Sequence, residues 1–102
     1  MIFGRKRFGE VIARQLGFFV EEDSDLLDDV DAALEAYNRA DKSEAEELYG
    51  DYQLAIEAAT DRLAELRDAY AQSVDDPETY VDEFNKAAVD RWPPLSLTIE
   101  ES

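Results

Sequence analysis

An unbroken apolar stripe at helical spacing between residues 45 and 70 restricts the fold more than any other feature of the sequence. Its members follow one another at alternating intervals of four and three residues: Ala45, Tyr49, Tyr52, Ile56, Ala59, Leu63, Leu66 and Tyr70. Such spacing places all of them on one face of an α-helix. We therefore predict a helix over residues 44–74, roughly 45 Å long at about 1.5 Å per residue. Ser43 and Glu46 match a capping box at its start.

A second helical stripe precedes this helix, over residues 8–40. Its members are Phe8, Ile12, Leu16, Phe19, Leu27, Val30, Leu34 and Tyr37. The sequence EEDSD at residues 21–25 interrupts the stripe without contributing an apolar side chain. Two alternatives follow: a solvated turn within one long helix, or a break with Ser24 as the N-cap of a new helix.

A third helical segment is predicted over residues 77–92. Asp76 is a favourable N-cap, Pro77 is suited to the first helical position, and the prolines of the sequence WPP end the segment. Short loops make sequential helices antiparallel neighbours. We therefore expect an all-α fold: an antiparallel up-down-up bundle of three helical segments in a single domain, residues 1–92, followed by a short irregular C-terminal tail, residues 93–102.

The composition excludes most catalytic and metal-binding chemistry. The chain has no cysteine and no histidine, which removes the usual nucleophilic thiol, the usual general base and the commonest metal ligand. An EF-hand loop starting at Asp23 would need a glutamate at position 34, where the chain has leucine. We expect a protein that is not an enzyme and has no catalytic residue, cofactor or metal. With neither a secretory signal nor a membrane-spanning apolar run, we expect it to be cytoplasmic.

The charge of the chain is strongly polarised. Residues 1–20 have four cations and one carboxylate, a net charge of +3, whereas residues 21–102 have 6 cations and 25 carboxylates, a net charge of −19. Arg5, Lys6 and Arg7 form a basic cluster that could contact an anionic surface, or simply act as a solvent-facing cap. The neighbouring phenylalanines Phe8, Phe18 and Phe19 are interpreted as core residues rather than as a lipid-binding wedge.

The predicted bundle has unequal ends. Three helical segments overlap near the termini, but residues 26–40 and 44–58 form a two-helix hairpin with no third helix to cover it. The apolar residues left partly uncovered there are a candidate partner-binding surface. They are Leu34, Tyr37, Leu48, Tyr49, Tyr52 and Ile56.

Two functional hypotheses follow from these patterns. The first is a non-enzymatic helical protein–protein interaction module that self-associates, for instance as a homodimer, or binds another protein through the hairpin around residues 34–56. The alternative is a small charge-based regulator, acting either as an acidic mimic of nucleic acid or through its basic N-terminal head at an anionic surface. We do not expect nucleic acid as a direct ligand, nor a membrane, and we identify no small-molecule substrate.

Overall fold

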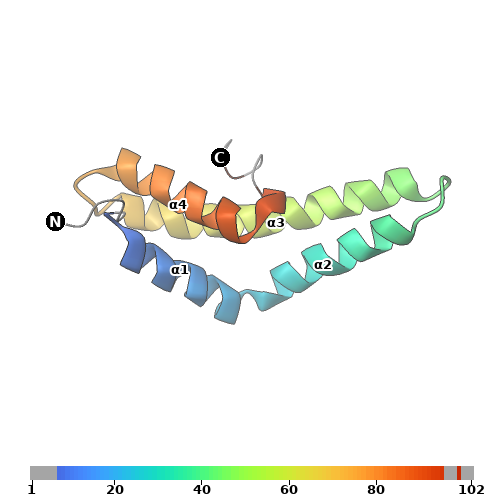
Figure 1. Cartoon of the computed structure of the whole chain (residues 1–102), viewed down its shortest axis with the longest axis horizontal. Coiled ribbons are helices and arrows are strands. Elements are labelled where there is room, and N and C mark those ends of the chain that lie inside the picture. Colours follow the sequence, from blue (N-terminus) through green and yellow to red (C-terminus); the bar gives the residue numbers. More distant parts are fainter. Residues whose placement is uncertain (1–6, 96–98, 100–102) are drawn as a thin grey trace.

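The chain forms four α-helices and one short 3₁₀ turn in the computed structural model, which describes residues 7–95 and residue 99 (Figure 1). These elements are α1 (Gly9–Glu22), α2 (Ser24–Arg39), α3 (Ala45–Ala71), α4 (Pro77–Arg91) and η1 (Pro93–Leu95). No strand occurs among the described residues, so the all-α fold class is confirmed.

The predicted first segment is broken into two helices, which is one of the two alternatives for residues 21–25, so the structure has four helices rather than three helical segments among the described residues. The break is at Asp23, whose carboxylate accepts a hydrogen bond of 3.1 Å from Nε of Arg62 on α3. Ser24 is the first residue of α2 rather than its N-cap. The break lets α1 and α2 take different directions along the same side of the longer α3 (Figure 1).

Helix α3 is confirmed as the longest element, with 27 residues, but its start differs from the prediction. The side chain of Asp41, not that of Ser43, accepts the hydrogen bonds at this end. Asp41 Oδ1 accepts from the backbone N–H of Ser43 at 3.0 Å and of Glu44 at 3.1 Å, and from the hydroxyl of Ser43 at 2.7 Å. Because the Ser43 hydroxyl donates to Asp41, the predicted capping box does not form.

Helix α4 begins as predicted. Asp76 accepts hydrogen bonds from the backbone N–H of Thr79 at 3.3 Å and from its hydroxyl at 2.8 Å, and Pro77 is the first helical residue. After the helix ends at Arg91, Pro93–Leu95 form the 3₁₀ turn. Leu95 and Ile99, which lie in the predicted tail, are both buried in the core.

The core lies where α1, α4 and the second half of α3 meet. Its buried apolar residues on these helices are Ile12, Leu16, Phe19, Ala59, Leu63, Tyr80, Phe84 and Ala88. Phe19 is fully buried and Phe8 is partly buried, but Phe18 is 47% exposed, so its assignment to the core is wrong. The molecule is elongated, 55 × 25 × 23 Å, with a radius of gyration of 15.5 Å, compared with about 13 Å for a compact domain of this length.

Candidate protein-interaction surface

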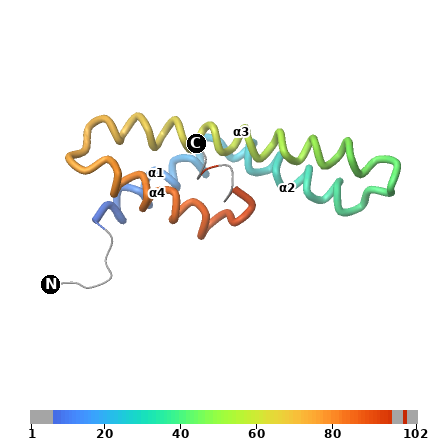
Figure 2. The backbone as a smooth tube through the Cα atoms, turned by 90° about the horizontal axis from the view of Figure 1, so that it is seen from above, coloured from blue at the N-terminus to red at the C-terminus, as the bar shows by residue number. Residues whose placement is uncertain are grey.

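Residues 24–58, here called the arm, project from the core as a pair of helices: α2, the connecting loop and the first half of α3 (Figures 1 and 2). Val30 and Ile56, at the base of the arm, are buried, with exposed fractions of 7% and 6%. Between them, residues 31–55 are all described and none is buried. The outer arm therefore has two helices in contact but no interior of its own.

The structure brings the predicted tyrosines together on the arm. The ring centroids of Tyr37 and Tyr49 are 5.4 Å apart, and those of Tyr49 and Tyr52 are 6.4 Å apart. Tyr49 is 46% exposed, whereas Tyr37 and Tyr52 are half-buried.

The other three predicted partner-binding residues differ in their exposure. Leu34 and Leu48 are half-buried, and Ile56 is buried at the base. We call the set of six residues the arm seam; it consists of Leu34, Tyr37, Leu48, Tyr49, Tyr52 and Ile56.

Helical spacing shows which side of α3 carries Tyr49. Tyr49, Ile56, Leu63 and Arg67 follow one another at intervals of seven, seven and four residues, so they share one side of the helix. Nη1 of Arg67 donates a hydrogen bond of 2.9 Å to Oδ1 of Asn85 on α4. Tyr49 therefore lies on the side of α3 that α4 covers farther along the helix.

The C-terminal end of α4 and the turn that follows it border a hollow beside α2. Leu27, Val30 and Asp31 line a hollow of about 230 Å³ together with residues 91–95. Leu34 lies one helical turn beyond Val30, past the end of α4. Among the described residues, α4 packs on α1 and α3 and does not contact α2, and Figure 1 shows α4 ending midway along α3. The side of α3 that carries Tyr49 therefore continues, uncovered, past the end of α4.

The arm carries a disproportionate share of the negative charge. It contains 11 acidic and 2 basic residues, a net charge of −9, and the other 67 residues have a net charge of −7. Of its two cations, Arg39 forms an exposed ion pair of 3.0 Å with Glu35. Asp31 and Glu46 are exposed, and each precedes a seam residue, Leu34 or Tyr49, by three positions. Residues three apart are neighbours on a helix surface, so these carboxylates flank the seam.

The basic cluster is only partly described. Arg5 and Lys6 lie outside the described residues. Arg7 forms an ion pair of 2.6 Å with Asp75 and one of 3.5 Å with Asp76, and its guanidinium lies 5.1 Å from the centroid of the Phe8 ring. The hydrogen bond and charge of Asp75 raise the pKa of Arg7. Sequence reasoning missed this pairing because Asp75 is 68 residues away along the chain.

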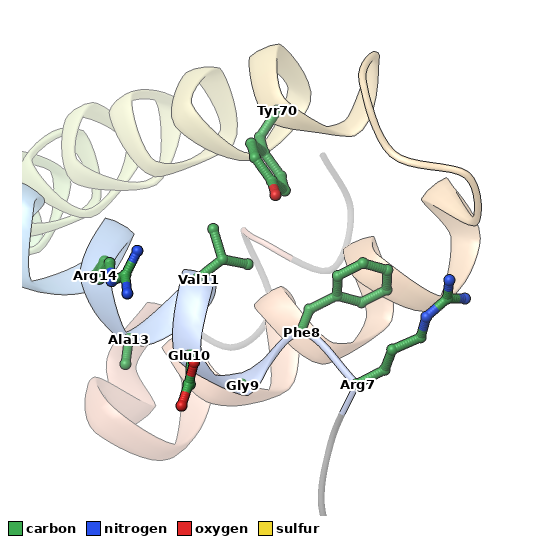
Figure 3. Close-up of a pocket in the computed structure, with 8 residues that line it drawn as sticks. All are labelled: Arg7, Phe8, Gly9, Glu10, Val11, Ala13, Arg14 and Tyr70. Atoms are coloured by element: carbon green, nitrogen blue, oxygen red, sulfur yellow. The ribbon is translucent and has the colours of Figure 1, made fainter.

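The N-terminal end of α1 borders an open hollow of about 780 Å³. Figure 3 shows Tyr70 of α3 facing Val11 and Phe8 across it, with Arg14 on one side and Arg7 on the other. Arg14 is exposed and makes no ion pair with any described residue. The hollow thus combines apolar side chains with the charged side chains of Arg7, Glu10 and Arg14. It is open and Arg7 is already paired with Asp75, so it is not an enclosed, mostly apolar small-molecule site.

The shifted pKa values belong to groups outside the arm seam. Burial raises the pKa of the Tyr80 phenol, whose hydroxyl donates a 2.6 Å hydrogen bond to Gln15. The Thr79 hydroxyl lowers the pKa of Asp76, the Ser43 hydroxyl lowers that of Asp41, and the Asp23 carboxylate raises that of Arg62. These groups stabilise helix ends or connect helices, which is a structural role.

The described residues contain neither a metal-binding cluster nor a membrane-spanning helix. In residues 7–95 and 99, no three acidic side chains are placed so that they could hold a metal ion. None of the described helices combines the length and the apolar character that crossing a membrane requires. Comparisons with protein-family models, with curated proteins and with solved structures find no match, so the proposal that follows rests on sequence and geometry.

Proposed function

We propose that this protein is a non-enzymatic helical interaction module that uses the arm seam to bind another protein or a second copy of itself. The observation that carries the proposal is the stretch of residues 31–55, which contains no buried residue although it forms two helices in contact. Helices in proteins obtain most of their stability from burying an apolar face. A bound partner would supply the interior that the outer arm lacks.

The chemistry of the arm seam supports a protein partner. Tyrosine and leucine side chains gain about 1.5–3 kcal/mol each when fully buried, and tyrosine is enriched at protein interfaces because its hydroxyl can remain hydrated. Tyr49 is nearly half-exposed and contacts Tyr37 and Tyr52, so the three rings form a continuous aromatic surface. The proposal keeps the cytoplasmic location expected from the sequence.

The charge-based alternative has less support from the described residues. Arg7, a member of the basic cluster, is already paired with Asp75 and Asp76 of the same chain. A mimic of nucleic acid needs carboxylates at the contact, whereas here an aromatic surface lies between them. A contact that buries Tyr49 would have aromatic rings at its centre and carboxylates only at its edges, unlike a contact that imitates a phosphate backbone.

Tyr49 and Phe18 form a matched pair for testing the proposal. Their exposed fractions, 46% and 47%, are almost equal, but Tyr49 lies on the arm and Phe18 lies on α1. Sedimentation of the wild-type chain, Tyr49→Glu and Phe18→Glu at micromolar concentration would measure self-association. Affinity capture from the native host with the same three proteins would measure binding of other proteins.

We expect an association, with itself or with a captured protein, that Tyr49→Glu abolishes and Phe18→Glu preserves. Circular dichroism would check that both variants remain helical. A strictly monomeric wild-type chain, together with captured proteins that do not depend on Tyr49, would refute the proposal.

A further inference from the structure

Helix α4 is an example of a third helix that packs on α3 and on its neighbour α1. Tyr80, Phe84 and Ala88, at intervals of four residues, are all fully buried. Helix α4 has 15 residues and α3 has 27, so α3 is longer than the helix that covers it by 12 residues. Trp92 and the two prolines that follow stop α4 at Arg91. The uncovered length is about 18 Å, enough for three turns of another helix.

The carboxylates beside the arm seam indicate the charge of that helix. Asp31 on α2 and Glu46 on α3 are exposed, and each lies about one helical turn from Leu34 or Tyr49. The arm as a whole has a net charge of −9. Complementary charge speeds association and disfavours partners of like charge. A helix with an apolar stripe and cationic flanks fits this surface.

The helices of a second copy of this chain fit it poorly. Each of its four helices has more acidic than basic residues, with net charges of −2 for α1, −4 for α2, −5 for α3 and −2 for α4. Any of these helices placed on the arm seam would bring carboxylates against Asp31 and Glu46. Like charges at close range cost binding free energy.

We propose that the occupant of the arm seam is a cationic amphipathic helix of another protein, lying end to end with α4 along Leu34 and Tyr49. This inference rests on the proposed function and specifies its partner. The mode of recognition is a helix that lays its apolar face on a hydrophobic strip, with anchors at intervals of three and four residues. Lysine or arginine on both sides of that face would pair with Asp31 and Glu46.

Three synthetic peptides of about 16 residues each would test the partner class. The first has a leucine and tyrosine stripe at helical spacing with lysine elsewhere. The second keeps the stripe and replaces lysine with glutamate. The third has the composition of the first with the stripe scrambled. Fluorescence anisotropy of labelled peptide would measure binding to the full chain in low and moderate salt.

Variants of the chain would locate the contact. Tyr49→Glu removes the aromatic surface, and the double variant Asp31→Asn, Glu46→Gln neutralises the flanks without touching the seam. Leu54→Glu is the control, because Leu54 is 65% exposed but lies about half a turn from Tyr52 and Ile56 on α3. We expect the first peptide to bind at least about tenfold more tightly than the other two, and both test variants to weaken it by a similar factor. Leu54→Glu should leave its binding unchanged.

The remaining outcomes separate the inference from the proposed function. Equal binding of the scrambled peptide would show attraction by charge alone and overturn the inference. Equal or tighter binding of the glutamate peptide would overturn the cationic partner while leaving the arm as an interaction surface. Self-association that depends on Tyr49, with no peptide bound, would identify a second copy as the occupant and again overturn only the inference. No peptide binding together with no association dependent on Tyr49 would overturn both.

Discussion

The backbone N–H of Phe8 donates a 2.9 Å hydrogen bond to Oε1 of Glu83, 75 residues farther along the chain. Oε2 of the same carboxylate accepts a 3.3 Å hydrogen bond from the backbone N–H of Arg7. The residue before α1, Phe8, has no side chain that could cap the helix. A side chain of α4 therefore satisfies donors at the start of α1, and its negative charge is favourable at a helix N-terminus.

Replacing Glu83 should therefore destabilise the fold. We expect Glu83→Ala to lower the free energy of unfolding by about 1 kcal/mol, because two backbone donors lose their acceptor. Glu83→Gln should cost less, since its amide oxygen can still accept. Urea unfolding would measure both, with Asp82→Ala as a control because Asp82 is exposed and makes no hydrogen bond to a described residue. An equal loss in all three variants would contradict the capping role.

A buried hydroxyl in α3 offers a stabilising substitution. Thr60 is fully buried, and its Oγ1 has no hydrogen-bond partner among the described residues. Valine has nearly the same shape without the hydroxyl, so Thr60→Val should raise the free energy of unfolding by about 1 kcal/mol. Thr79→Val is the matched control: it removes the 2.8 Å hydrogen bond to Asp76 and should be destabilising. A loss of stability in Thr60→Val would contradict the prediction.

Two helical glycines have no structural requirement for glycine. A Cβ atom added to Gly17 or to Gly50 would meet no described atom within 4 Å beyond the adjacent residues and the backbone of its own helix, and neither residue has a positive φ. Each change to alanine should raise the free energy of unfolding by about 0.5–1 kcal/mol, because alanine loses less backbone entropy on folding. The midpoint of thermal unfolding should rise for each variant and rise further for the pair, since the sites lie on different helices. An unchanged or lower midpoint would show a steric or functional role for the glycine.

Local signals explain which parts of the fold could be predicted from the sequence. The stripe between residues 45 and 70 and the pair Asp76 and Pro77 predicted α3 and the start of α4, because each depends only on neighbouring residues. The break near residues 21–25 could be predicted only as one of two alternatives, because the sequence EEDSD does not show that Asp23 pairs with Arg62, 39 residues away. The capping residue of α3 was assigned wrongly because Asp41 and Ser43, two residues apart, are both suitable capping residues, and their own hydrogen bond decides between them.

The candidate surface likewise has features that the sequence could predict and features that depend on distant residues. Helical spacing alone placed Tyr37, Tyr49 and Tyr52 on facing stripes, and their rings are in contact. Spacing could not show that Ile56 is buried at the base of the arm, because that depends on where α4 and η1 pack along α3. Likewise, Phe18 lies on the edge of a stripe in the sequence, but it is exposed because no element covers that edge.

The arm should open more readily than the core. Residues 31–55 include no buried residue, whereas Ala59, Leu63 and Arg67 on the same helix are buried. Local opening is easiest where few apolar contacts are lost. In native-state hydrogen exchange, amides of the outer arm should therefore have lower opening free energies than amides of residues 59–67. Uniform protection along α3 would mean that the arm is as stable as the core without a partner.

The cap of α4 predicts a defined dependence of stability on pH. The hydrogen bonds from Thr79 lower the pKa of Asp76 in the folded state, so the unfolded chain binds a proton at this residue at higher pH than the folded chain does. The stabilisation is therefore fully present above the ordinary aspartate pKa of about 3.9 and is lost as the pH falls through the lower folded value.

The measurement that isolates this effect is the difference in melting temperature between the wild-type chain and Asp76→Ala. The difference should be constant between about pH 5 and pH 7 and should shrink below about pH 4. Taking a difference removes the general effect of neutralising the other carboxylates of this acidic chain, which alters both proteins alike. Asp82→Ala, two turns into the same helix, should show no such narrowing. A gap between wild type and Asp76→Ala that persists unchanged down to about pH 2 would mean that the cap does not depend on the charge of Asp76.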